Sequence, residues 1–167
     1  MTKYGSPARV AAVALTALLI AGPASAGEVK KQTSSGMAKG ADAARKSHRL
    51  ILQVNANDPA MMNLALNNAT NVAQYYNDIG EKITIEIVTY GPGLHMLRED
   101  TSPVKARIKA ISASTPSISF AACDNTRENM TRVESKEIPL VTEAKVVKSG
   151  VVHVMELQEQ GWTYVKP

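Results

Sequence analysis

From Arg49 to Val165 the sequence alternates short runs rich in β-branched residues with longer stretches of helical periodicity. This alternation constrains the fold most, because it is typical of α/β proteins in which helices connect neighbouring parallel strands. Five strands are expected, at residues 49–55, 82–90, 117–122, 143–147 and 162–165. Since the four crossovers between them should be right-handed, helices should cover both faces of a mainly parallel five-stranded sheet.

The boundaries of the first two helices are marked by local signals. Asp58 is expected to cap the first helix and Pro59 to occupy its first position, where a missing N–H costs nothing. Gly80 should end that helix. Ser102-Pro103 should open the second helix. The apolar residues at helical spacing predict the buried faces of both helices: Met62, Ala65, Leu66, Ala69, Val72, Ala73 and Tyr76, then Val104, Ile108 and Ile111.

The second half of the chain carries two further helix starts. Cys123 stands at the exit of the third strand, and the side chains of Asp124-Asn125-Thr126 are expected to cap the helix that follows. Ser149 should cap the last helix, and Gly161 should turn the chain into the last strand. Met155, on that last helix, is predicted to fill the core.

The first 47 residues are expected to lie outside this domain. Lys3 and Arg9, the apolar stretch 10–21 and the small residues Ala24-Ser25-Ala26 together predict a secretory signal over 1–26, cleaved before Gly27. Residues 27–47 read as a flexible basic linker, followed by the α/β domain at 48–167. We therefore expect a periplasmic or secreted protein without a stable membrane anchor.

Composition narrows the classes of partner and cofactor. The sequence has 167 residues, of which only 4% are aromatic, so single-stranded nucleic acids would find few stacking surfaces. One cysteine excludes an intramolecular disulfide or a multi-thiolate metal site, and the three histidines have no ligand spacing. Gly91-Pro92-Gly93 lacks the third glycine of a dinucleotide motif. Neither a metal ion nor another cofactor is expected.

Cys123 is the residue whose type and position both suggest chemistry. In parallel sheets ligand sites gather at the carboxyl ends of strands, and the N–H groups at a helix start stabilise a thiolate. Asn125, Thr126 and Arg127 are the expected supports of that thiolate, whereas Asp124 would oppose its ionisation. The alternative is a buried cysteine that acts as a small hydrophobic residue. Both interpretations stay open at this point.

His95 is the second candidate for a catalytic role. It follows a strand that ends near Cys123, where an imidazole could hold a thiolate or donate a proton. A solvated loop histidine is the competing interpretation. The same loop contains Gly91, Gly93 and Leu94, which could hold a small ligand or a partner.

Three segments carry a resemblance to a known family: Tyr90-Gly91-Pro92-Gly93-Leu94, Phe120-Ala121-Ala122-Cys123-Asp124-Asn125-Thr126, and Ser149-Gly150-Val151 leading to Gly161-Trp162 and the following residues. The order and spacing of these segments resemble those of exported single-domain members of the DsrE/DsrF-like family. The resemblance implies a flavodoxin-like fold and a homo-oligomer such as a trimer or hexamer. It also implies that Cys123 accepts sulfane sulfur as a persulfide.

Two hypotheses about function result. In the first, the exported protein handles sulfur, with Cys123 cycling between thiolate and persulfide and exchanging sulfur with a donor or acceptor protein. In the second, the chain is a non-catalytic homo-oligomeric binding module, in which Cys123 is buried and the loop of Gly91, Gly93 and Leu94 binds a small ligand or another protein.

Overall fold

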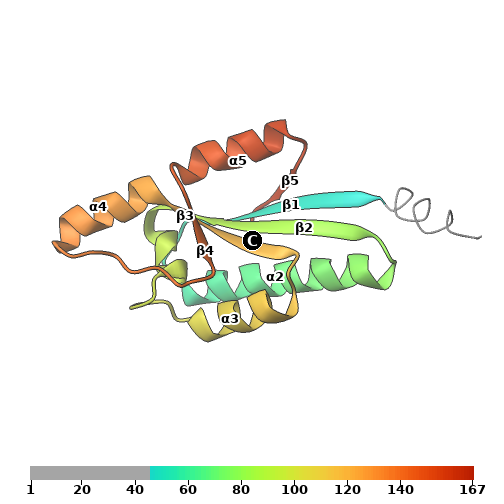
Figure 1. The fold of residues 1–167 in the computed structure, drawn as a ribbon, viewed down its shortest axis with the longest axis horizontal. Helices are drawn as coiled ribbons and strands as arrows, with labels where there is room; N and C mark the ends of the chain where they lie inside the picture. The colour runs from blue at the N-terminus through green and yellow to red at the C-terminus, as the bar shows by residue number, and fades with distance from the viewer. Residues whose placement is uncertain (1–45) are drawn as a thin grey trace, which may run out of the picture. The chain divides into compact units, whose positions relative to one another are not determined.

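The computed structural model describes residues 46–167, so the expected signal segment and residues 27–45 of the expected linker lie outside the described residues. The elements follow one another as a succession of strands and helices (Figure 1). Their bounds are β1 Ser47–Val54, α2 Pro59–Asp78, β2 Lys82–Thr89, the 3₁₀ helix η1 Gly91–Leu97, α3 Lys105–Ser114, β3 Ile118–Cys123, α4 Asp124–Glu134, β4 Ala144–Val147, α5 Gly150–Glu159 and β5 Thr163–Val165.

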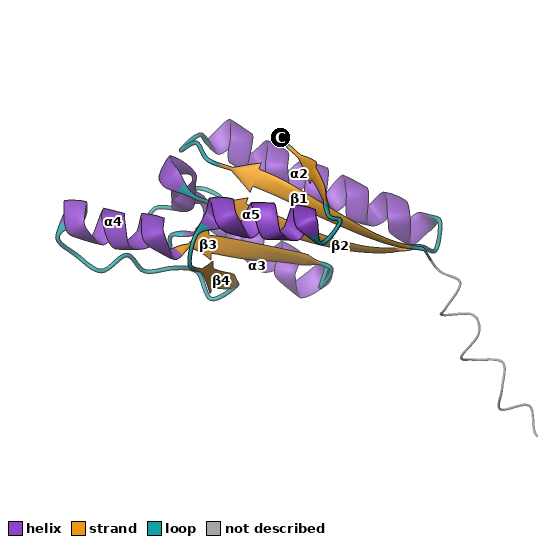
Figure 2. Ribbon diagram, turned by 90° about the horizontal axis from the view of Figure 1, so that it is seen from above, coloured by secondary structure: helices purple, strands orange, loops and turns teal. Residues whose placement is uncertain are grey.

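The five strands form one parallel sheet in the order β4-β3-β2-β1-β5, which confirms the predicted single α/β domain of flavodoxin-like form. Three successive crossovers run the same way across the sheet, and the fourth returns from β4 to the opposite edge. Right-handed crossovers that run in opposite directions place their helices on opposite faces. Accordingly, α2 and α3 lie on one face and α5 on the other (Figures 1 and 2).

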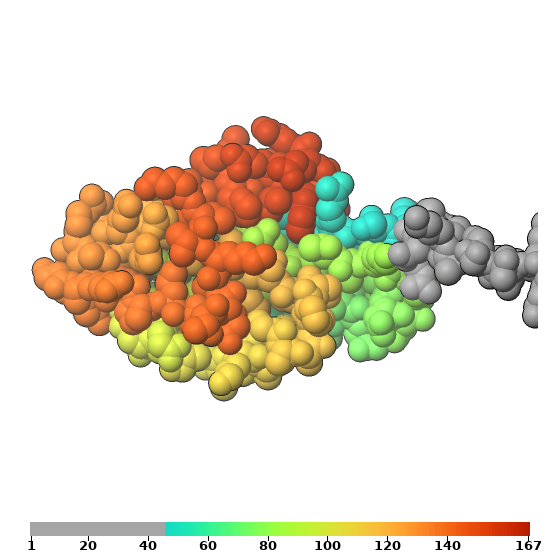
Figure 3. Space-filling view, viewed as in Figure 1, coloured from blue at the N-terminus to red at the C-terminus, as the bar shows by residue number. Residues whose placement is uncertain are grey.

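α4 occupies neither face fully. It extends beyond the carboxyl end of β3, and none of its residues is buried. The space-filling view shows α4 at one side of the described α/β domain, with the surface of α5 along the upper side (Figure 3). In its middle only Met130 packs against the main core, so contacts at its two ends add to what holds this helix in position.

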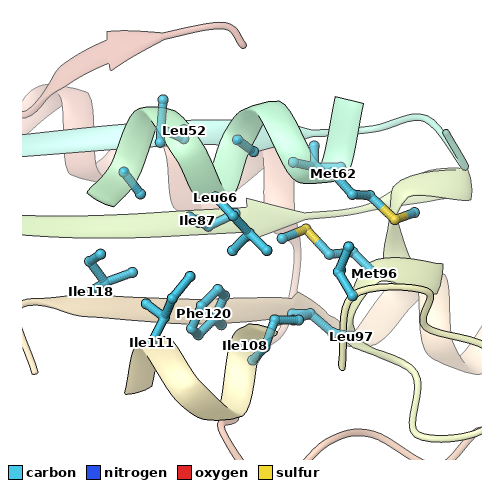
Figure 4. Packing of buried hydrophobic residues seen from close by; sticks show 14 of the residues in the cluster. Leu52, Met62, Leu66, Ile87, Met96, Leu97, Ile108, Ile111, Ile118 and Phe120 are labelled. Atoms are coloured by element: carbon cyan, nitrogen blue, oxygen red, sulfur yellow. The ribbon is translucent and has the colours of Figure 1, made fainter. Parts of the chain in front are cut away.

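The main core fills the space between the sheet and the α2 and α3 helices (Figure 4). Leu52 of β1, Ile87 of β2 and Phe120 of β3 point into it from the sheet, and Leu66 and Ile108 meet them from the helices. All five side chains are fully buried. The predicted buried faces of the first two helices are therefore confirmed at their central positions.

A smaller cluster lies under α5. It contains Ile51, Val88 and Ala121 from the sheet, and Val154 and Leu157 from the helix. The expectation that Met155 fills the core is wrong, because 56% of this residue is exposed. Adjacent helical residues lie about 100° apart around the axis, so the residue next to Val154 points away from the sheet.

The boundaries of α2 agree with the local signals, but the expected side-chain caps of the last two helices are not formed. Cys123 is the N-cap of α4 and Asp124 already lies within that helix, and Ser149 is the N-cap of α5 without a side-chain hydrogen bond. Asp58 accepts a hydrogen bond from the backbone N–H of Ala60 at 2.8 Å, and Gly80 has a φ of 71° where α2 ends. α3 begins at Lys105, slightly later than Pro103 suggested. Here the Ser102 hydroxyl accepts a hydrogen bond from the N–H of Val104 before the helix starts.

The loop after β2 contains a close contact between backbones. A Cβ atom on Gly93 would lie 2.2 Å from the carbonyl oxygen of Val54 and 2.8 Å from the Cα of Asn55. Such distances are far inside van der Waals contact, so only glycine lets η1 cross the carboxyl end of β1.

Within residues 46–167, no helix combines the length and the apolar character needed to cross a membrane.

The contact at Gly93 gives a test of the fold. Gly93→Ala should lower the free energy of unfolding by about 4 kcal/mol or more, because the clash is with backbone that cannot rotate away. The control is Gly80→Ala, since Gly80 has a positive φ but no neighbour within 4 Å of an added Cβ. This variant should lose about 1 kcal/mol. Urea unfolding followed by circular dichroism measures both, and equal losses would contradict the assigned contact.

Candidate functional site at the carboxyl edge of the sheet

Cys123 is the last residue of β3 and the N-cap of α4. Its neighbour across the sheet is Val147 of β4. Alternation along β3 puts its side chain on the α5 face, together with that of Ala121. Only 4% of the residue is exposed. The thiol therefore lies at the edge where a ligand site was expected, but it is covered.

The cover is the start of α5. A Cβ atom on Gly150 would lie 3.2 Å from the Cβ of Cys123 and 2.9 Å from Cδ1 of Tyr90. The first residue of α5 thus rests on both side chains. The cysteine thus lies beside the starts of two helices, α4 and α5. The first four N–H groups of a helix have no acceptor within the helix.

Tyr90 is the aromatic neighbour of Cys123. The register pairs Thr89 of β2 with Ala122 of β3, so the next residues, Tyr90 and Cys123, are adjacent and on the same face. Burial raises the pKa of the Tyr90 phenol above its ordinary value, and the nearby Tyr164 and Cys123 raise it further. The phenol therefore stays protonated in the neutral range and can act as a hydrogen-bond donor. The hydroxyl of Tyr164 itself donates a hydrogen bond to the side chain of Gln53.

The three residues expected to support a thiolate have other partners. The Arg127 guanidinium donates to Asp124 at 2.9 and 3.1 Å, so the two opposing charges beside the cysteine neutralise each other. The backbone N–H of Asn125 donates to the carbonyl of Lys148 at 3.2 Å, and the Thr126 hydroxyl accepts the N–H of Gly91 at 3.0 Å. These contacts fasten α4 to its neighbours.

A separate crevice gathers most of the other predicted residues. It has a volume of about 440 Å³ between η1 and α4, and its lining includes Gly91, His95, Asn125 and Thr126. Nδ1 of His95 lies 2.8 Å from the Thr101 hydroxyl. Cys123 does not line this crevice. The structure thus brings the predicted residues to one edge of the sheet but divides them between two surroundings.

The two remaining loop candidates have structural positions. Leu94 is fully buried in the main core, together with Met96 and Leu97 of the same 3₁₀ helix. Its side chain is therefore not available to a ligand, contrary to the expectation for a binding loop. Gly93 is required by the backbone contact with β1.

An ion cluster fixes the far end of α4. Arg98 is only 1% exposed, and its guanidinium donates to both carboxylate oxygens of Asp100, at 2.9 and 2.8 Å, and of Glu134, at 2.5 and 2.9 Å. Lys136 adds a contact to Asp100 at 2.9 Å. These ions join the segment after η1 to the end of α4, while Thr126 joins its beginning to Gly91.

Two members of this edge were missed from the sequence. Tyr90 could have been found by extending the expected pairing of the second and third strands by one residue. Arg98 offered no such signal, because its partner Glu134 is 36 residues away.

Within residues 46–167, no group of three or more His, Cys, Asp or Glu side chains could hold a metal ion.

Comparison with known proteins gives a likeness in fold. No protein-family model matches the chain, and no curated protein matches it. Among solved structures, the chain is similar to MTH1491 from Methanobacterium thermoautotrophicum, described as a protein of unknown function. The two are 27% identical with a TM-score of 0.61, and the likeness covers 72% of this chain and 99% of the other. It supports the α/β fold.

The ion cluster predicts how stability depends on pH. Hydrogen bonds from Arg98, and then from Lys136, hold the pKa of the Asp100 carboxyl well below its ordinary value. The stabilisation is therefore complete above the unfolded-state pKa of about 4 and is lost as the pH falls through the lower folded-state value. Asp100→Asn should melt at a lower temperature than the wild type at pH 7, and the difference should shrink towards pH 2.

Thermal unfolding between pH 7 and pH 2 measures this effect. Asp78→Asn is the matched control, since the partner of Asp78 is the uncharged Gln74. The control should keep the wild-type acid dependence. A constant gap between Asp100→Asn and the wild type across the whole range would contradict the assignment.

Proposed function

We propose that this chain is an exported sulfur-handling protein that carries sulfane sulfur as a persulfide on Cys123. The observation that carries the proposal is the position of the cysteine beside the starts of α4 and α5, with the protonated phenol of Tyr90 next to it. Helix N–H groups and a phenol O–H are donors suited to an anionic sulfur. The segments around Tyr90, Cys123 and Gly150 resemble exported members of the DsrE/DsrF-like family, and the sulfur-trafficking relatives in that family use a cysteine in this region, which agrees with this role.

The proposed step is an exchange without net oxidation. The Cys123 thiolate attacks the outer sulfur of a donor persulfide or polysulfide, and a new S–S bond forms as the donor's S–S bond breaks. The electron pair of the broken bond leaves on the donor, which departs as a thiolate or a shorter polysulfide. Delivery to an acceptor thiolate is the same reaction in reverse. The chain needs no second cysteine for either step.

The burial of Cys123 has a consequence for this chemistry. With 4% of the residue exposed, a small inorganic donor reaches the sulfur more readily than a bulky reagent does. The same cover shields a bound persulfide from thiols in solution. Loading should therefore be slower than for an exposed cysteine, and loss should be slower as well.

Assembly and location belong to the same proposal. Export would follow from the signal predicted at residues 1–26, which lie outside the described residues. A homo-oligomer such as a trimer or hexamer would cover apolar side chains that α5 exposes, among them Val151, Val152 and Met155. A protein that donates or accepts sulfur is the remaining partner of this proposal.

Sulfur loading can be measured directly. The folded protein is incubated with sodium tetrasulfide, freed of small molecules and weighed intact by mass spectrometry. The wild type should gain the mass of one sulfur atom, whereas Cys123→Ser should gain none. His95→Ala should load like the wild type, because the proposed hydrogen-bond donor to the sulfur is Tyr90, whereas His95 lines the crevice between η1 and α4. An unmodified wild type would rule out the proposal.

A second function is favoured by one observation, the small exposed fraction of Cys123. If the cysteine is a structural residue of the core, the chain would be a non-catalytic homo-oligomeric binding module. A native thiol then reacts with iodoacetamide only after unfolding, and tetrasulfide adds no sulfur. Labelling of the folded protein, together with persulfide formation, would exclude this second function.

A further inference from the structure

α5 covers Cys123, but few of its side chains hold it to the sheet. The helix lies over β2 and β3 (Figure 2), and only three of its ten residues are buried. Its first turn is closed by a hydrogen bond from the N–H of His153 to the carbonyl of Ser149, at 2.9 Å. A contact between the His153 side chain and the sheet would therefore also hold Gly150 over the cysteine.

Such a contact exists between His153 and Glu86 of β2. His153 comes three residues after Gly150 and four before Leu157, so it lies on the face of α5 that meets the sheet. Glu86 shares the α5 face of β2 with Val88, two residues further along the strand. Nε2 of His153 lies 3.3 Å from a carboxylate oxygen of Glu86, and the two side chains are 22% and 12% exposed.

The two groups depend on each other. The register partners of Glu86 cannot balance its charge, because Ile51 is apolar and the Ser119 hydroxyl donates to the carbonyl of Ile85 at 3.2 Å. Nε2 of His153 is buried and has no hydrogen-bond partner within residues 46–167. A carboxylate taken out of water is costly without a counter-charge. The protonated imidazole of His153 supplies that counter-charge.

Other titratable groups face this interface from the strands under α5 and from α5 itself. By alternation along the strands and by helical spacing they are Arg49, Lys82, Tyr90, Cys123, Lys145, Glu156 and Tyr164. Within residues 46–167, neither His153 nor Glu86 forms an ion pair with any of them. Among all these residue types, only histidine ordinarily changes its charge between pH 5 and 8.

The sign of the pH effect follows from this pairing. A positive charge near the start of a helix is opposed by the helix dipole, so the pairing with Glu86 is what favours the protonated imidazole. The ion pair is complete in acid and is lost as the pH rises through the imidazole range. Glu86 then stays under α5 without a counter-charge, and the helix is held less firmly.

We propose that His153 is a positioning residue whose protonated imidazole, paired with Glu86, holds the start of α5 over Cys123, so that exposure of the thiol rises with pH. His153 acts through Gly150 and not on the sulfur itself. The consequence rests on the proposed function: a persulfide on Cys123 is retained in acid and exchanged faster as the imidazole loses its proton.

Hydrogen–deuterium exchange of the α5 amides in the full-length protein tests this hold without any sulfur chemistry. Dividing the rate of a variant by the wild-type rate at the same pH cancels the intrinsic pH dependence of amide exchange. For His153→Gln this ratio should be about 5 at pH 5.5, as expected for the loss of one partly exposed ion pair, and should fall towards 1 at pH 8.5. Iodoacetamide labelling of Cys123 in the folded protein should give the same trend.

Two further variants separate the ion pair from other effects. Glu86→Gln breaks the same pair from the sheet, so adding it to His153→Gln should not raise exchange further at pH 5.5. Glu159→Gln is the matched control, because it removes a charge from an exposed residue at the end of α5. This control should exchange like the wild type at every pH. In the wild type itself, exchange of α5 relative to that of α2 should rise between pH 5.5 and 8.5.

A ratio that is equal at pH 5.5 and 8.5, a ratio that rises with pH, or additive effects of the two substitutions would each overturn the inference. So would a constant relation between α5 and α2 in the wild type, a result that requires no variant to fold. The proposed function fails separately. A protein that gains no sulfur from tetrasulfide but shows the pH-dependent ratio would lose the sulfur role and keep the role of His153.

Discussion

The start of α5 can rest on the carboxyl edge of the sheet only because residue 150 has no side chain. A Cβ atom there would lie 2.9 to 3.2 Å from atoms of Tyr90 and Cys123, tighter than ordinary packing allows. This one contact brings the last helix over the ends of β2 and β3 and covers the cysteine. It also places a second helix start, whose first N–H groups have no acceptor within the helix, beside Cys123. The candidate site is thus a consequence of a missing methyl group.

The carboxyl edge has two faces with different chemistry. On the α5 face, Cys123 is enclosed with the phenol of Tyr90. On the other side, His95 and Thr126 line an open crevice between η1 and α4. Between them, α4 is held at its beginning by Thr126 and at its end by the Arg98 ions, because it has no buried residue of its own. Together with the partly buried Met130, which packs against the main core, these contacts keep its helix start beside the cysteine.

Much of the fold could be predicted from local patterns. Asp58, Gly80 and Gly161 mark ends of elements through backbone chemistry that needs no knowledge of the rest of the chain. Right-handed crossovers predict helices on both faces of the sheet, but they do not place the last strand beside β1. What local patterns could not supply was the set of partners. Arg98 pairs with Glu134, 36 residues away, and Gly150 packs against Tyr90 and Cys123, and no local pattern links these positions.

Carriage of sulfur, rather than mere modification of a buried thiol, is the central claim about Cys123. It is tested most directly by loading the folded protein, removing the free donor and adding cyanide, which takes the outer sulfur as thiocyanate and restores the thiolate. We predict close to equimolar thiocyanate from the wild type and none from Cys123→Ser. A loaded, folded protein that releases no thiocyanate until it is unfolded would contradict the claim.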